Sequence, residues 1–313
     1  MPKKKKFSGY TNKGRRDVKQ EILEELMNPD DNIAFLDAEF NAGMDSATGE
    51  RICEIISVGL VICDGSYNGI KKYYSLVNTV TRKKIFPVIS QMTGITSDML
   101  IGQPEFGEVS GKIQEMVKKY SIKKIYTWGA ADKHSLLGEK KLVRQLKAKD
   151  YQYASKWTYI DMCTDISEVI SSKILGIKGN LTINMENLMF VCKMDKKQEH
   201  NALSDAYALY KCIKYLRQIY MEPAKSNEFM ETKELINNYY QEKSTYNSFR
   251  RFRCTSKGAD LYGTYSDKEM ENTNNDMRIK ALLDDIKYLK GEIPMEKEFD
   301  SIQAYFKNHR TLE

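Results

Sequence analysis

Two carboxylates stand at the end of an apolar run near the start of the chain. Asp37 and Glu39 close the segment Ile33 to Phe40, whose composition is typical of a β-strand. Because residues i and i+2 of a strand point to the same face, the two carboxylates would leave the strand side by side. Such like charges repel, and a divalent cation such as Mg²⁺ or Mn²⁺ would compensate them. An isolated Asp-x-Glu also fits a strand that simply ends in a solvated turn.

Three further residues could complete such a site. Asp132 ends the segment Trp128-Gly129-Ala130-Ala131-Asp132, where a strand gives way to a helix. His200 lies five residues before Asp205. In one continuous helix their side chains would point about 140° apart, so we expect His200 in the loop before the helix, with Asn201 as the cap. Taken singly, Asp132 also suits a helix N-cap, Asp205 a complement to the helix dipole, and His200 an exposed loop.

The elements that position these residues indicate an α/β domain. Strands are predicted at Ile33–Phe40, Ile52–Cys63, Lys71–Asn78, Ile122–Trp128 and Trp157–Met162. Helices are predicted at Val18–Met27, Phe106–Tyr120, Asp132–Lys147, Asp165–Ile174, Asn184–Cys192 and Ala202–Ile219. The first three strands are joined by short turns and favour an antiparallel meander. Because helix and strand alternate after it, we expect a mixed sheet flanked by helices.

Composition narrows the class of protein. The chain has 313 residues, of which 41% are hydrophobic and 29% charged, as in soluble globular proteins. No stretch is apolar enough to span a bilayer, and the basic segment Lys3–Lys6 has no apolar run behind it, so we expect neither a membrane partner nor a secretory signal. Six cysteines without a CxxC pair argue against a zinc ribbon and for reduced, mostly buried thiols in the cytoplasm.

In this order along the chain, the motifs resemble those of the DEDDh exonucleases. This family has a ribonuclease H-like fold and includes proofreading exonucleases, ribonuclease T and oligoribonuclease. The matching segments are Phe35–Phe40, Trp128–Asp132 and His200–Ala206, supported by the Thr-Gly-Ile stretch within Gln91–Thr96. The resemblance runs from about Asn32 to Ile219. It implies a ribonuclease H-like mixed five-stranded sheet flanked by helices.

The resemblance also implies roles for the five residues. Asp37, Glu39 and Asp205 would hold two Mg²⁺ or Mn²⁺ ions, with Asp37 bridging them. Asp132 would support the second ion, and His200 would be the general base toward the attacking water. Two such ions about 3.5–4 Å apart stabilise both the attacking and the leaving oxygen of a phosphodiester. The implied product is a nucleoside 5′-monophosphate released from a 3′ end.

Further positions of the resemblance concern the terminal nucleotide. They are Ala38, Phe40, Thr93, Gly94, Ile95 and His200. An aromatic residue there suits single-stranded ends because every base has a π-face for stacking. For Phe40, ordinary core packing is an equal alternative.

The chain divides into three predicted parts. Residues 1–30 form a basic tail and a short helix, 31–220 the exonuclease domain, and 221–313 a charged, mainly helical C-terminal extension of unknown role. Within the extension, Met277–Leu289 is the best helix, and Phe249–Arg253 alternates aromatic and basic residues. Such basic clusters suit either a solvated surface or an anionic partner such as nucleic acid.

These observations predict a metal-dependent 3′-to-5′ exonuclease acting on single-stranded nucleic acid. RNA is favoured over DNA, because the Asp-x-Glu-Phe form of the first motif resembles the exoribonuclease branch. One alternative is a proofreading or accessory exonuclease subunit acting on DNA, with a protein partner docked on 221–313. Another is a non-catalytic nucleic-acid-binding scaffold of the same fold. All five functional positions are filled, which favours the enzyme.

Overall fold

The sheet of the molecule has five strands in the order β3-β2-β1-β4-β5. This computed structural model describes residues 17–44, 49, 51–178, 181–194, 199–223 and 227–253. β1 (Ile33–Met44), β2 (Arg51–Cys63) and β3 (Gly69–Leu76) form the predicted antiparallel meander. β4 (Lys124–Thr127) and β5 (Cys163–Asp165) add parallel pairs beside β1. The predicted mixed sheet is therefore confirmed, and β1 at its centre runs past its predicted end.

The predicted strand Trp157–Met162 is wrong. Tyr159–Met162 forms the short helix α6, and the edge strand β5 follows it. The apolar side chains that suggested a strand are instead buried beside the sheet by a helical turn. Trp157 packs edge-on against Phe106 with ring centroids 5.7 Å apart, and the Tyr159 hydroxyl lies 2.7 Å from the Ser110 hydroxyl. The helix predicted at Asp165–Ile174 begins later than predicted, because Asp165 belongs to β5.

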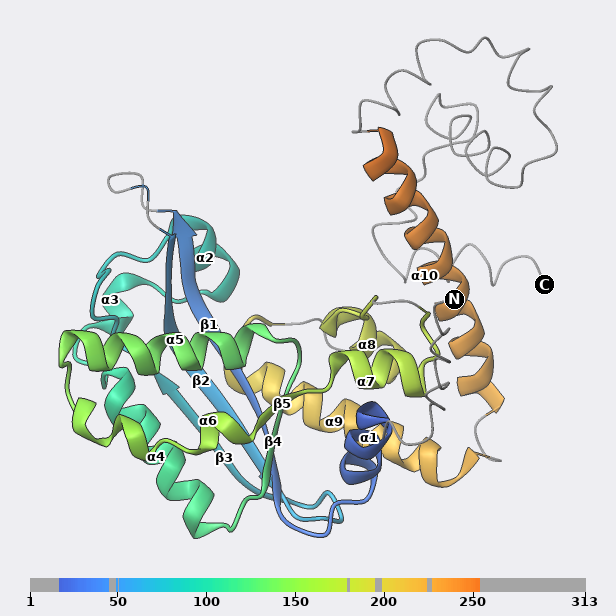
Figure 1. Cartoon of the computed structure of the whole chain (residues 1–313), viewed down its shortest axis with the longest axis horizontal. Helices are drawn as coiled ribbons and strands as arrows, with labels where there is room; N and C mark the ends of the chain where they lie inside the picture. Colours follow the sequence, from blue (N-terminus) through green and yellow to red (C-terminus); the bar gives the residue numbers. More distant parts are fainter. Residues whose placement is uncertain are drawn as a thin grey trace, which may run out of the picture.

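Two hydrophobic clusters cover the two faces of the sheet. Consecutive residues of β1 alternate between them: Ala34 and Leu36 enter one cluster, and Ile33 and Phe35 enter the other. On the first side lie α4 (Phe106–Lys119), α5 (Ala131–Leu146), α6 and the 3₁₀ helix η1 (Tyr151–Lys156). On the second lie α8 (Met185–Val191) and α9 (Ala202–Met221), as Figure 1 shows for α5 and α9. The predicted helices at these positions are confirmed with small shifts at their ends.

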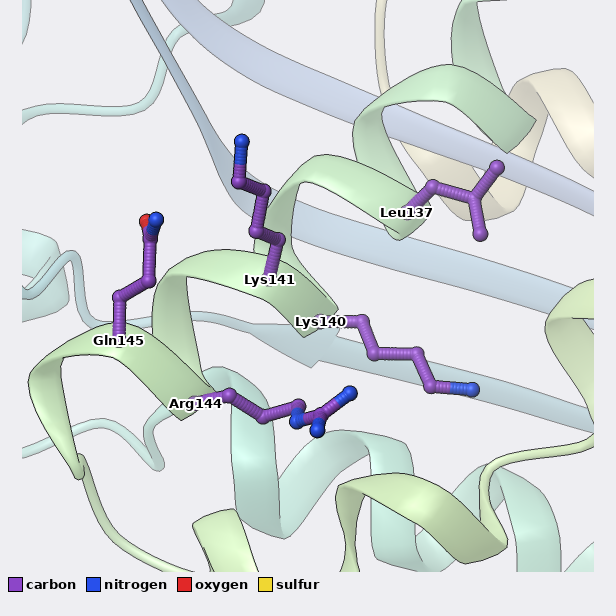
Figure 2. A pocket seen from close by; sticks show the side chains of 5 residues that line it. All are labelled: Leu137, Lys140, Lys141, Arg144 and Gln145. Carbon is purple, nitrogen blue, oxygen red and sulfur yellow. The ribbon is translucent and has the colours of Figure 1, made fainter.

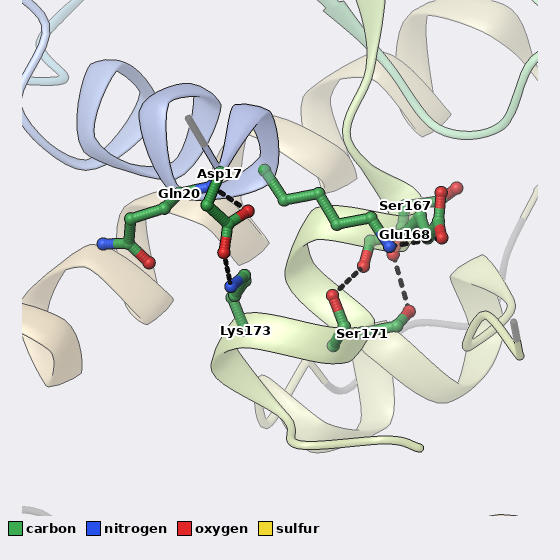
Figure 3. Close-up of polar contacts among 8 residues, drawn as sticks. Asp17, Gln20, Ser167, Glu168, Ser171 and Lys173 are labelled. Carbon is green, nitrogen blue, oxygen red and sulfur yellow. Dashed lines mark hydrogen bonds and ion pairs between the residues drawn. The ribbon is translucent and has the colours of Figure 1, made fainter. Parts of the chain in front are cut away.

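The N-terminal helix α1 spans Val18–Met27, as predicted. Asp17 caps it and also pairs with Lys173 in the π-helical turn Ile170–Ile174 (Figure 3). A second ion pair joins Lys19 to Glu168 of α7 (Ser167–Val169). Exposed pairs of this kind contribute little singly, but together they fasten α1 to the segment after β5.

A β-bulge in β2 lies opposite Glu39 and Phe40 of β1. Glu39 pairs with Ser57 and Phe40 with Ile55, so Ile56 is an extra residue in β2. Ile56 enters a third cluster with residues of the segment that forms α2 (Pro87–Thr93) and α3 (Ser97–Leu100), two helices that the sequence did not predict. Bulges occur often beside active sites, where they redirect the chain. Here Ile56 of the bulge shares its cluster with Ile95 of the Thr-Gly-Ile stretch.

The chain continues beyond residue 220 into α10 (Asn227–Arg253). Its first half packs on the second face of the sheet domain, with Phe229, Ile236 and Tyr239 buried in the cluster that contains Phe35. The basic cluster 249–253 lies on the last turns of α10, and the predicted helix 277–289 falls outside the described residues. Among the helices that the structure describes, none is long and apolar enough to cross a membrane. The cysteines at 63, 163, 192 and 212 are free and buried, and Cys53 is free and exposed.

Candidate active site

The acidic pair of β1 faces α9. Asp37 lies opposite Gly59 of β2, and Glu39 lies opposite Ser57. A Cβ atom on Gly59 would come within 2.2 Å of the Ala202 carbonyl oxygen. Only glycine therefore lets the first turn of α9 lie directly on the sheet beside the two carboxylates.

The turn before α9 brings His200 to the same place. Its backbone is left-handed, with φ of 50°, which ends the loop without extending the helix. Asn201 is the N-cap, and its side chain accepts a hydrogen bond from the Ser204 N–H at 3.1 Å. Asp205 follows in the first turn and is 1% exposed. The predicted loop position of His200 and the predicted cap are both confirmed.

Three of the predicted residues form a compact ligand set. One ligand atom each from Glu39, His200 and Asp205 lies within 4.8 Å of the other two. These atoms come from β1, the loop before α9 and the first turn of α9. Carboxylate oxygens with one imidazole nitrogen suit hard or borderline divalent cations.

Asp132 approaches from the other side of the sheet. Ala130 is the N-cap of α5, so the N-cap alternative for Asp132 is wrong. The Asp132 Oδ1 atom instead accepts a hydrogen bond from the backbone N–H of Ala38 at 3.0 Å. Since Ala38 stands between Asp37 and Glu39, this contact fixes Asp132 beside the acidic pair.

Burial and neighbouring acids raise the pKa of three of the carboxylates. Burial, with the nearby charges of the other three acids, holds the pKa of Asp37 well above its usual range. Burial and Asp205 raise the pKa of Glu39 to about 7. Burial, opposed by the Ala38 hydrogen bond, raises the pKa of Asp132 to about 8. A cluster that holds its negative charge this poorly fits bound cations, which would remove the repulsion.

The predicted nucleotide-binding positions have different surroundings. The Ala38 side chain is buried in the cluster under α5, and Phe40 packs partly against the same cluster. Gly94 ends α2 with φ of 72°, and the Thr93 hydroxyl accepts a hydrogen bond from the Ile95 N–H at 3.1 Å. Ile95 itself is buried. The role of these positions in nucleotide binding stays a prediction.

Two residues near the site were not found from the sequence. Asp165 accepts hydrogen bonds from the N–H groups of Gly129 and Ser167, both at 2.8 Å, and so holds the loop that leads to Asp132. Tyr74 lies opposite Gly59 on the far side of β2. Burial and the charge of Glu39 raise the Tyr74 pKa, which a hydrogen bond to Asn201 lowers. Both depend on strand pairing, which no local pattern in the sequence reveals.

Residues 34–213 match the profile of the RNase_T exonuclease family. This range is more than half of the chain and contains every residue of the site, so the chain belongs to this exonuclease family. The predicted DEDDh membership, ribonuclease H-like fold and nuclease activity are confirmed. The family depends on divalent metal ions, in keeping with the ligand set of Glu39, His200 and Asp205. No curated protein matches the chain.

Solved structures of other exonucleases are similar to part of this chain. A 3′-exonuclease that recognises the 3′ end of a histone mRNA stem-loop is 18% identical, with a TM-score of 0.49 over 64% of this chain and 70% of the other. The nuclease domain of 3′hExo, a DEDDh member bound to rAMP, is 15% identical, with a TM-score of 0.43 over 62% of this chain and 94% of the other. Exonuclease I of E. coli with single-stranded DNA is 16% identical, with a TM-score of 0.45 over 64% and 43%. These identities are too low to transfer a substrate.

Proposed function

We propose that this exonuclease removes nucleotides one at a time from the 3′ end of single-stranded nucleic acid and releases nucleoside 5′-monophosphates. The observation that carries the proposal is the convergence of four carboxylates and one histidine. Ligand atoms of Glu39, His200 and Asp205 lie within 4.8 Å of one another. Asp132 accepts a hydrogen bond from the backbone N–H of Ala38, the residue before Glu39.

The donor set suits two divalent cations, Mg²⁺ or Mn²⁺. Asp37, Glu39 and Asp205 would hold them, and Asp132 would support the second. Bound there, the cations would stabilise the negative charge on the attacking and leaving oxygens. The raised pKa values of Asp37, Glu39 and Asp132 support this proposal, because bound cations would offset the repulsion among buried carboxylates.

His200 acts as the general base in this proposal. Its imidazole takes a proton from a water molecule, whose oxygen attacks the phosphorus of the last phosphodiester. The bond between phosphorus and the 3′ oxygen of the preceding nucleotide breaks, and that oxygen takes a proton from solvent. The left-handed backbone of His200 and the Asn201 cap hold the loop against α9. The base is thereby oriented before substrate binds.

Phe40 and the Thr93-Gly94-Ile95 turn contact the terminal nucleotide in this proposal, together with Ala38. RNA is the preferred polymer, supported by the Asp-x-Glu-Phe form of the first motif. The chain works in the cytoplasm, and residues 221–313 are a candidate docking region for a protein partner.

Single-stranded RNA and DNA of one sequence, each labelled at the 5′ or the 3′ end, test the proposal. With Mg²⁺ or Mn²⁺, the 5′-labelled strand should shorten in single-nucleotide steps, while the 3′ label should appear at once as a mononucleotide. EDTA should stop both reactions, and RNA should be cut faster than DNA. Internal cutting, shortening from the 5′ end or activity in EDTA would each overturn it. Faster cutting of DNA would reverse the polymer preference alone.

A further inference from the structure

The outer side of α5 is positively charged throughout. The two acids of α5, Asp132 and Glu139, are 4% and 3% exposed, so their charges do not reach the surface. The other ionisable side chains of the helix are Lys133, His134, Lys140, Lys141 and Arg144. None of these forms an ion pair with another described residue. The exposed side of α5 is therefore free to bind an anion.

The cations share one flank of the helix. Lys133, Lys140, Lys141 and Arg144, which we name the α5 basic stripe, follow the spacing i, i+7, i+8 and i+11. Residues so spaced lie on one side of an α-helix. The Lys133 Nζ donates to the Cys163 carbonyl oxygen at 2.8 Å, and the Lys140 Nζ donates to the Trp157 carbonyl oxygen at 3.4 Å. These bonds hold two of the four charges in place before any ligand binds.

A surface hollow of about 420 Å³ lies along this stripe. It is lined by Leu137, Lys140, Lys141, Arg144 and Gln145 (Figure 2). Figure 2 shows Lys140 and Arg144 extending in one direction from neighbouring turns of α5, and Lys141 and Gln145 in another. Three cations around one hollow, with an apolar side chain beside them, suit the phosphate and sugar of a nucleotide.

The helix beside α5 carries two exposed aromatic rings. The 3₁₀ helix η1 packs against α5, and its Tyr151 and Tyr153 are 42% and 48% exposed. The Lys156 Nζ lies 5.5 Å from the centre of the Tyr153 ring. Aromatic rings beside cations are typical of surfaces that bind single-stranded nucleic acid.

The stripe begins at the candidate active site. Lys133 follows Asp132 in the first turn of α5. At 1.5 Å per residue, Arg144 lies about 18 Å from Asp132 along the helix axis. One strand of a double helix carries a phosphate about every 3.4 Å, so a single strand that keeps this stacked form covers the distance with about five nucleotides.

We propose that the α5 basic stripe and the η1 tyrosines bind the part of the substrate strand that lies upstream of its 3′ end. This inference rests on the proposed function and adds a second contact surface to it. The stripe binds the backbone, the tyrosines stack on bases, and substrates longer than about six nucleotides gain affinity from both.

The paired variant Lys141→Ala/Arg144→Ala tests the stripe, since neither side chain makes a structural hydrogen bond in the described residues. Binding of a 5′-labelled 20-nucleotide single strand is measured in EDTA over a range of salt concentrations. We expect about tenfold weaker binding at 0.15 M salt and a salt slope smaller by about 1.4, the contribution of two phosphate contacts on a single strand. Hydrolysis of a dinucleotide with Mg²⁺ should be unchanged, because it is too short to reach the stripe.

Two comparisons sharpen the test. Lys118→Ala/Lys119→Ala removes the same charge from the exposed end of α4 and should change neither affinity nor slope. Tyr151→Ala/Tyr153→Ala should weaken binding with the slope kept, because stacking releases no counterions. The proposal is overturned if the stripe variant matches the α4 variant, or if dinucleotide hydrolysis falls as well. An unmodified chain that binds the strand but never cuts it would refute the proposed function and leave this surface standing.

Discussion

Asp205 of α9 lies near both acids of β1. It is buried in the first turn of α9, and its charge raises the pKa of both Asp37 and Glu39. Replacing it by Asn keeps the shape but removes a metal ligand. We expect Asp205→Asn to lower exonuclease activity about 10³-fold, equivalent to about 4 kcal/mol of transition-state stabilisation. The melting temperature in EDTA should stay the same or rise, because a buried repulsion is lost.

Exonuclease rate and thermal unfolding of Asp205→Asn are compared with those of Asp161→Asn, an exposed acid of α6 that should behave as the unmodified chain. Retained activity in Asp205→Asn would remove this residue from the site. Of the residues near it, Asp37 and Glu39 could be placed on one face from strand alternation, and His200 from the angle of a helix. Asp165 and Tyr74 could not, because each acts across a strand pairing that the sequence does not specify.

At the scale of the element, α5 has a buried carboxylate outside the site. Glu139 is 3% exposed and accepts a hydrogen bond from the Ile55 N–H at 2.6 Å. Burial raises its pKa to about 8, with the charge of Glu54 adding to the effect and the Ile55 bond opposing it. The folded chain therefore binds this proton more tightly than the unfolded chain, whose glutamates titrate near pH 4.3. Between these two values, stability falls as pH rises.

Glu139→Gln should remove that loss, because an amide stays neutral and its oxygen still accepts the Ile55 hydrogen bond. We compare the free energy of unfolding of Glu139→Gln with that of the unmodified chain. We expect this difference to be about 3 kcal/mol larger, in favour of the variant, at pH 8 than at pH 5. Urea unfolding in EDTA at several pH values measures the difference. The titration of the metal-site acids affects both chains equally, so it cancels in the comparison. Glu231→Gln, an exposed change on α10, serves as the control. Parallel pH profiles for Glu139→Gln and the unmodified chain would contradict the assignment.

The same helix shows how much of the structure the local sequence pattern predicts. Its apolar positions predict α5 within one residue at each end, but not that Glu139 is buried beside Ile55. The strand predicted at Trp157–Met162 failed for a related reason. Its apolar side chains are buried from a helical turn, and a short apolar segment does not distinguish a buried strand from a buried helix.

At the scale of the whole molecule, α10 belongs to the folded unit more closely than a boundary at residue 220 suggests. Ile236 and Tyr239 are fully buried in the cluster that contains Phe35 and Leu209, whereas Met230 of the same helix is 55% exposed. We therefore expect Ile236→Ala to cost about 3 kcal/mol, which lowers the melting temperature by about 6–12 °C. Met230→Ala should have little effect.

Tryptophan fluorescence makes this a test of the domain division. Both tryptophans of the chain, Trp128 and Trp157, lie in the sheet domain, so their signal reports only its unfolding. If α10 is part of the cooperative unit, Ile236→Ala shifts the tryptophan transition by the full amount, and far-ultraviolet circular dichroism shows one coincident transition. If the exonuclease domain folds independently of everything after residue 220, the tryptophan transition stays where it is and only helical signal is lost at lower temperature. The first result would place the domain boundary after the buried half of α10, because the sheet domain needs Ile236 to complete its core.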